Sequence, residues 1–112
     1  MTPGCTTQAC DFRDQQKNFK NTVILGVSID SQERHQKFIE KHDIPFTLLA
    51  DIDKKVVQKY GVWQEKKLYG KTFMGIVRST FIIDKTGTVR KIFLKVKVKN
   101  HVEEVLSAIK KL

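Results

Sequence analysis

The chain has 112 residues and 40% hydrophobic residues, which suits one folded domain with a core rather than a disordered segment. It contains no apolar run long enough to cross a membrane and no N-terminal secretory pattern, so we expect a cytoplasmic protein. The net charge of +9 raises nucleic-acid binding as a function, but the lysines are spread along the chain without a zinc finger or an RNP-like motif. We therefore expect no nucleic-acid partner.

The first thirteen residues hold both cysteines, Cys5 and Cys10. Thr2 followed by Pro3 is typical of a helix start, with Thr at the N-cap and Pro at the first helical position. Cys5 would then lie in the first turn, where unpaired backbone N–H groups and the positive end of the helix dipole favour an ionised sulfur. Cys5 is therefore a candidate nucleophile on local grounds.

The next elements are a strand and a second helix. The first helix should end near residues 17–20, and the continuous apolar run 23–29 predicts a strand covered on both faces. Asp30 follows this strand and is expected to cap the next helix, with Glu33 as its capping-box partner. Such a buried strand normally has neighbours on both sides, so an opening strand would be missing from this α/β order.

A second strand and a third helix continue the βαβ rhythm. Residues 45–50 predict the strand, and Asp53 is expected to open a helix that stops at Gly61. Residues 62–77 contain Gly70 and Gly75 as breakers and predict a long irregular loop with a functional role.

The last third of the chain predicts a hairpin and a helix. Strands over residues 79–84 and 88–94 flank a turn in which Gly87 supplies a positive φ. Asn100 should cap the final helix, with Glu103 as its capping-box partner. The apolar stripe of this helix comprises Val102, Val105, Leu106, Ile109 and Leu112.

Two cysteines with four residues between them fit neither a disulfide framework nor a structural zinc site. In a reducing compartment such a pair is more often catalytic or redox-sensing. His35 and His42 share one face of a predicted helix, but their spacing without a carboxylate triad favours structural roles over metal binding. Three aromatic residues in the predicted loop are interpreted as packing residues rather than as a cofactor platform: Trp63, Tyr69 and Phe73.

At this point the sequence resembles peroxiredoxin Q, the bacterioferritin comigratory protein subfamily of the peroxiredoxins, from Thr2 to Leu112. The resemblance rests on Thr2-Pro3-Gly4-Cys5-Thr6, Cys10-Asp11-Phe12-Arg13, Gly26-Val27-Ser28, Tyr60-Gly61-Val62-Trp63, Tyr69-Gly70-Lys71 and the block from Met74 to Asp84. The order of these blocks makes the match specific.

The resemblance implies one thioredoxin-like peroxiredoxin domain over residues 1–112 that reduces hydrogen peroxide or alkyl hydroperoxides. It places the peroxidatic cysteine at Cys5 and the resolving cysteine at Cys10, with Thr2 and Arg78 as activating groups; Arg78 is expected on a distant strand. An intramolecular disulfide would be recycled by thioredoxin or a similar dithiol. No metal or organic cofactor is implied.

Family members carry an N-terminal hairpin and a first core strand ahead of the position of Thr2, about forty residues at ordinary element lengths. The resemblance therefore describes an N-terminally truncated peroxiredoxin. Full-length members are expected to be monomers, whereas exposed sheet edges would favour self-association of this chain. The alternative function is an inactive peroxiredoxin-like redox or interaction fragment that keeps the site residues without holding them in place.

Overall fold

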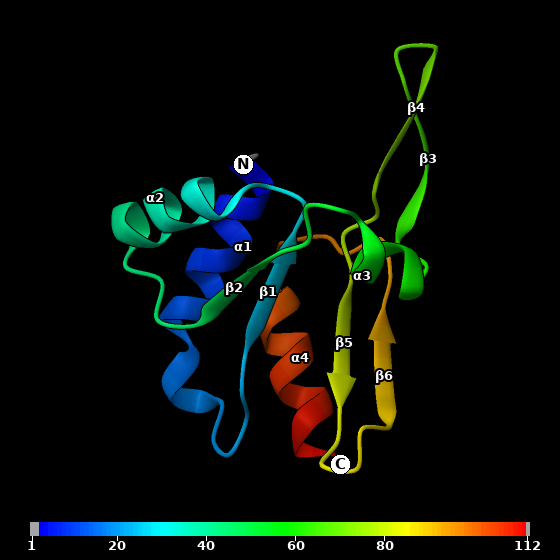
Figure 1. The fold of residues 1–112 in the computed structure, drawn as a ribbon. Coiled ribbons are helices and arrows are strands. Elements are labelled where there is room, and N and C mark those ends of the chain that lie inside the picture. Colours follow the sequence, from blue (N-terminus) through cyan, green and yellow to red (C-terminus); the bar gives the residue numbers. More distant parts are fainter. Residues whose placement is uncertain (1–2, 112) are drawn as a thin grey trace. The chain divides into compact units, whose positions relative to one another are not determined.

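The computed structural model describes residues 3–111, so the predicted N-cap Thr2 and the stripe residue Leu112 lie outside the described part. The helices and strands, drawn in Figure 1, are α1 (Pro3–Asp14), the 3₁₀ turn η1 (Gln16–Asn18), β1 (Leu25–Ser28), α2 (Gln32–His42), β2 (Thr47–Ala50), α3 (Lys55–Lys59), β3 (Trp63–Leu68), β4 (Lys71–Ile76), β5 (Thr80–Ile83), β6 (Val89–Phe93) and α4 (His101–Lys110). Among residues 3–111, no helix has both the length and the apolar character needed to cross a membrane.

The chain divides into two compact units, and each is described by itself. Within the described residues, the first unit comprises residues 3–53 and 98–111, and the second unit comprises residues 54–97. One domain over residues 1–112 stays a prediction.

The first unit is built on a βαβ segment. Strands β1 and β2 pair in parallel, with Leu25 opposite Thr47 and Ser28 opposite Ala50. Parallel neighbours need a crossover connection, and α2 supplies it. Helices α1 and α4 pack against each other in the same unit. Its buried apolar side chains are Phe19, Phe38, Ile44, Val102 and Val105.

The strand predicted at residues 23–29 is confirmed as β1, but its expected cover on both faces is wrong. Leu25 is 56% exposed and Val27 is 42% exposed, and Leu49 on the same face of β2 is 44% exposed. The opposite face, with Gly26 and Ser28, is half-buried. An apolar run shows that the side chains on both faces of a strand are hydrophobic, but it does not show whether another element covers each face. Within residues 3–111, β1 pairs with β2 alone.

The cap expected at Asp30 belongs to the next residue. Ser31 has an extended backbone, and its hydroxyl accepts a hydrogen bond from the N–H of Arg34 at 3.2 Å. An N-cap needs this extended conformation, so α2 begins at Gln32 and the Asp30–Glu33 capping box is wrong. Asp30 instead accepts a hydrogen bond from Ser28 Oγ at 3.0 Å and lies 3.6 Å from Arg34.

The second unit begins with a helix of only five residues. Lys54 takes a left-handed conformation, with φ of 62°, so α3 begins at Lys55 and the expected start at Asp53 is wrong by two residues. The predicted stop at Gly61 is confirmed, because Gly61 has φ of +73° and its N–H bonds the carbonyl of Gln58 at 3.0 Å. Tyr60 packs edge-on against Phe81, with ring centroids 4.9 Å apart.

The long loop predicted over residues 62–77 is wrong, because most of it forms the antiparallel hairpin β3–β4. Tyr69 and Gly70 make its two-residue connection with φ of 51° and 75°, the signs that a type I′ turn requires. Gly75 sits inside β4 because the side chain of Lys66 occupies the space beside it: Lys66 Cδ lies 2.8 Å from where a Cβ would be. The sequence alone does not distinguish a glycine such as Gly75, which leaves room for a neighbouring side chain, from a glycine that interrupts a strand.

The later elements follow the sequence pattern more closely. The hairpin β5–β6 is confirmed, and Gly87 in its turn has φ of +85°. Helix α4 begins after Asn100 as expected, and Val102 and Val105 are buried. Asn100, however, is left-handed and its side chain makes no capping hydrogen bond, so the predicted capping box with Glu103 is wrong.

Candidate functional site

Both cysteines lie on α1. Cys5 is the third residue of this helix, and the first turn contains no acidic side chain that would compete for its N–H groups. Cys10 follows five positions later; the two cysteines form no disulfide, and both are partly exposed. Five helical residues advance about 7.5 Å along the axis and about 140° around it. Because bridged Cα atoms lie within about 7 Å of each other, this intact helix holds the thiols apart.

The C-terminal half of α1 is fixed to the rest of the first unit. The ring of Phe12 lies 5.7 Å from that of Phe19 and 6.1 Å from the imidazole of His101, which it meets edge-on. Arg13 donates a hydrogen bond from Nη1 to the carbonyl oxygen of His42 at 2.5 Å. His42 is the last residue of α2, so Arg13 satisfies a carbonyl that has no partner within that helix.

Two titratable groups beside this anchor have shifted pKa values. A hydrogen bond to the Asp14 carboxylate at 3.0 Å raises the pKa of Arg13, which keeps its charge at every relevant pH. Burial lowers the pKa of His101, and the carboxylate of Glu104 opposes that shift. The imidazole is 2% exposed, so its neutral form suits its surroundings.

Arg78 belongs to the second unit. It lies in the short link between β4 and β5 rather than on a strand, and its carbonyl accepts a hydrogen bond from the N–H of Val96 at 2.9 Å. Its side chain is half-buried. The other predicted activating group, Thr2, lies outside the described residues.

The histidines on α2 have structural contacts. His35 is 3% exposed, and its Nε2 is hydrogen-bonded to the hydroxyl of Ser28. His42 packs against Phe38 with ring centroids 4.7 Å apart. Within residues 3–111, no group of three His, Cys, Asp or Glu side chains is placed to hold a metal ion.

A cavity of about 310 Å³ lies between the end of α1 and the start of α4. Its lining consists of Asp11, Asp14, Gln15, Lys99, Asn100, Val102 and Glu103. Neither cysteine lines this cavity.

Sequence reasoning missed the anchoring role of Arg13. Its acceptor is a backbone carbonyl 29 residues away, and no side-chain pattern marks such a partner. The contact of Phe12 with His101 likewise depends on the packing of α1 against α4.

Comparisons with known proteins agree on one family. The AhpC/TSA family matches residues 1–92. Peroxiredoxin Bcp of Bacillus subtilis is 56% identical over 112 residues, which cover 98% of this chain and 71% of that protein. Structures of the Xanthomonas campestris bacterioferritin comigratory protein, which concern its alkyl peroxide reduction activity, superpose with a TM-score of 0.93 at 40% identity, covering 98% of this chain and 70% of the other. A structure of peroxiredoxin Q from Xanthomonas campestris superposes with a TM-score of 0.93 at 41% identity, covering 98% of this chain and 71% of the other.

These matches and the α/β architecture define a thiol-dependent oxidoreductase with a thioredoxin-like fold. The chain belongs to the AhpC/TSA family of peroxiredoxins and is similar, within that family, to the Bcp or peroxiredoxin Q proteins. Its class of activity is peroxidase, with a peroxide as oxidant and a thiol as reductant. The resemblance noted in the sequence is thereby confirmed.

Proposed function

We propose that Cys5 is the peroxidatic residue of this peroxidase. Its thiolate attacks the terminal oxygen of a hydroperoxide, the O–O bond breaks, and the departing oxygen takes up a proton as water or alcohol. The sulfur loses two electrons to the peroxide and becomes a sulfenic acid. The helix N-terminus stabilises the thiolate, and the Arg78 guanidinium and Thr2 hydroxyl act as donors to the peroxide oxygens.

Cys10 is the resolving residue in this proposal. Its sulfur attacks the sulfur of Cys5, the S–S bond forms, and the hydroxyl group leaves with the Cys10 proton as water. The intact helix keeps the two thiols too far apart, so the turn between Cys5 and Cys10 must unwind first. A thioredoxin or similar dithiol in the cytoplasm then reduces the disulfide. Alkyl hydroperoxides are included as substrates because the Xanthomonas campestris relative reduces them.

The observation that carries this proposal is the position of the two cysteines on one helix. Cys5 lies in the first turn of α1, where a thiolate is favoured, and Cys10 is on the same helix within reach after local unwinding. The contacts of Phe12 and Arg13 hold the part of α1 that follows Cys10.

Peroxide consumption in the presence of thioredoxin and its reductase tests the proposal. We expect Cys5→Ser to abolish turnover, and Cys10→Ser to react once with peroxide and then stop. Mass spectrometry after one equivalent of peroxide should find an intramolecular Cys5–Cys10 disulfide in the unsubstituted chain. A Cys5-linked dimer, or full turnover by Cys10→Ser, would contradict the role of Cys10. A folded chain that consumes no peroxide would support the inactive-fragment alternative.

A further inference from the structure

The second unit carries the entire positive charge excess of the chain. Residues 54–97 hold twelve of the 21 Lys and Arg residues but two of the 12 Asp and Glu residues, a net charge of +10. The remainder holds nine basic and ten acidic residues, a net charge of −1. Counted along the chain the lysines look scattered, and only the division into units shows that they share one compact body.

Both acidic side chains of this unit are already included in that net charge, and one of them is bound within its own turn. The Asp84 carboxylate is bound within its own turn, accepting hydrogen bonds from the N–H groups of Thr86 and Thr88 at 2.9 and 3.0 Å. The hydrogen bond from the Thr86 hydroxyl, together with these two bonds, lowers the pKa of Asp84 to about 2, so this carboxylate stays ionised. Arg90 lies 3.4 Å away from it. Glu65 on β3 is the other acid. Anionic groups of a partner therefore meet a surface of nearly one sign.

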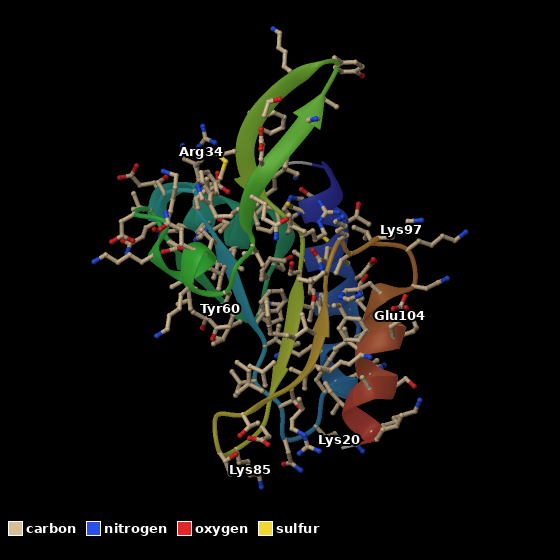
Figure 2. The ribbon with its side chains drawn as sticks, turned by 90° about the vertical axis from the view of Figure 1, so that its right-hand side faces the viewer. Lys20, Arg34, Tyr60, Lys85, Lys97 and Glu104 are labelled. Atoms are coloured by element: carbon tan, nitrogen blue, oxygen red, sulfur yellow. The ribbon has the colours of Figure 1, made fainter. Side chains whose placement is uncertain are left out.

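The hairpin β3–β4 is the most extended part of this surface. It reaches away from α3 and from the β5–β6 hairpin (Figures 1 and 2), and no third strand within residues 3–111 pairs with it. Lys66, Lys67 and Lys71 lie on its two strands, and all three are exposed. Figure 2 shows two further lysines, Lys85 and Lys97, directed into solvent near the two ends of the β5–β6 hairpin. Cations thus occur along the whole unit.

Aromatic rings are interleaved with these cations. Tyr69 at the tip of the β3–β4 hairpin is 94% exposed, so the packing role predicted for it is wrong. Its φ of 51° is one that a β-carbon disfavours. Folding gains no burial from a tyrosine at this position, where asparagine would suit the turn better. Phe73 on β4 is 45% exposed. The ammonium groups of Lys54 and Lys91 already lie over aromatic rings, 5.6 Å from Trp63 and 5.5 Å from Phe93.

We propose that the second unit binds single-stranded nucleic acid, with the β3–β4 hairpin as its principal contact. The lysines neutralise successive phosphates, and Tyr69 with Phe73 offers faces on which unpaired bases stack. A polyanion of uniform sign matches the scarcity of acidic side chains better than a protein surface does, since protein surfaces carry both signs. This function needs neither thiol and is independent of the proposed peroxidase mechanism.

The test measures fluorescence anisotropy of labelled oligothymidylate, about 15 nucleotides long, with the full chain across a salt series. We expect log affinity to fall linearly with log salt. Lys67→Gln/Lys71→Gln should make the slope shallower by about 1.4, because each phosphate contact contributes about 0.7. The matched control Lys37→Gln/Lys41→Gln removes the same charge from the exposed face of α2 in the first unit and should leave the slope unchanged.

Variants of Tyr69 distinguish binding that includes base stacking from binding by charge alone. Tyr69→Asn keeps a residue that favours the turn and removes the ring, and it should weaken binding about tenfold. Tyr69→Phe keeps the ring and should bind like the unsubstituted chain. Equal loss in both lysine pairs, no effect of Tyr69→Asn, or equal competition by polyglutamate or phosphatidylglycerol vesicles would overturn the proposal. Absence of binding at about 50 mM salt would do so as well.

Discussion

His101 connects the final helix to the helix that carries the thiols. Its imidazole is 2% exposed and meets Phe12 of α1 edge-on, at a centroid distance of 6.1 Å. A charged imidazolium is poorly solvated in such a position, which is why burial lowers its pKa. The carboxylate of Glu104, one turn further along α4, raises the pKa of His101, but this effect is smaller than that of burial. The neutral ring therefore stabilises the contact of α1 with α4.

We expect the first unit to lose stability as the pH falls below about 6.5. Above the unfolded pKa of 6.5 His101 is neutral in both states and contributes no pH dependence. Below it the unfolded chain binds the proton first, so the free energy of unfolding decreases until the folded chain is protonated too. Urea titrations between about pH 7.5 and 5 measure this slope, and His101→Leu should flatten it.

Glu104→Gln provides the control for that measurement. Because the carboxylate raises the pKa of His101, its removal should lower that pKa further and extend the loss of stability to lower pH. An unchanged slope in His101→Leu would assign the pH dependence to another group.

Helix α1 combines a half that is proposed to open with a half that is anchored. Arg13 joins its last turn to the carbonyl end of α2 through His42, and Phe12 contacts both Phe19 and His101. If the opening is confined to the turns before Cys10, the anchor limits how much helix is lost when the disulfide forms. The anchor would also return the chain to the same helix after reduction.

We expect Arg13→Ala to enlarge the loss of helix on oxidation. Far-UV circular dichroism of reduced and peroxide-treated chain gives the difference, which should correspond to about one to two turns in the unsubstituted chain and to more in Arg13→Ala. Asp14→Asn is the matched control, since it removes the exposed ion pair of Arg13 but keeps the bond to His42. If both variants lose the same amount of helix as the unsubstituted chain, the contact of Arg13 with His42 does not limit how much helix is lost on oxidation.

Elements with a local signal were predictable, and those that depend on distant contacts were not. The start of α1 near Cys5 and the turn at Gly87 follow from residues adjacent in sequence. The β3–β4 hairpin was missed because its strands are mostly polar and exposed, so no buried face gives them an apolar alternation. Its one clear signal is Tyr69-Gly70, two residues with positive φ.

The candidate site was predictable to the same extent. Cys5 and Cys10 were assigned from a helix N-terminus and from the family resemblance, and both lie on α1 as expected. Their reactive roles, with those of Thr2 and Arg78, stay predictions. The anchor at Arg13 required the structure, since its acceptor is a main-chain oxygen on another helix.

Over the whole molecule, charge is divided between the units rather than mixed. A net charge of +10 within residues 54–97 implies mutual repulsion among side chains of one compact body, whereas the first unit has a net charge of −1. Such repulsion destabilises a compact state, and salt screens it over a distance that shrinks from about 30 Å at 0.01 M to about 3 Å at 1 M. The two units should therefore respond differently to ionic strength.

We expect added sodium chloride to protect the second unit selectively. Native-state hydrogen exchange, measured between about 0.02 and 0.5 M salt, should show slower exchange of the β5–β6 and β3–β4 amides at high salt. The amides of α2 and β2 in the first unit should change little. Lys67→Gln/Lys71→Gln should reduce the salt effect in the second unit, because less repulsion remains to be screened. Equal protection of both units, or an undiminished effect in that variant, would mean that salt acts on the exposed apolar surface instead of on the charge.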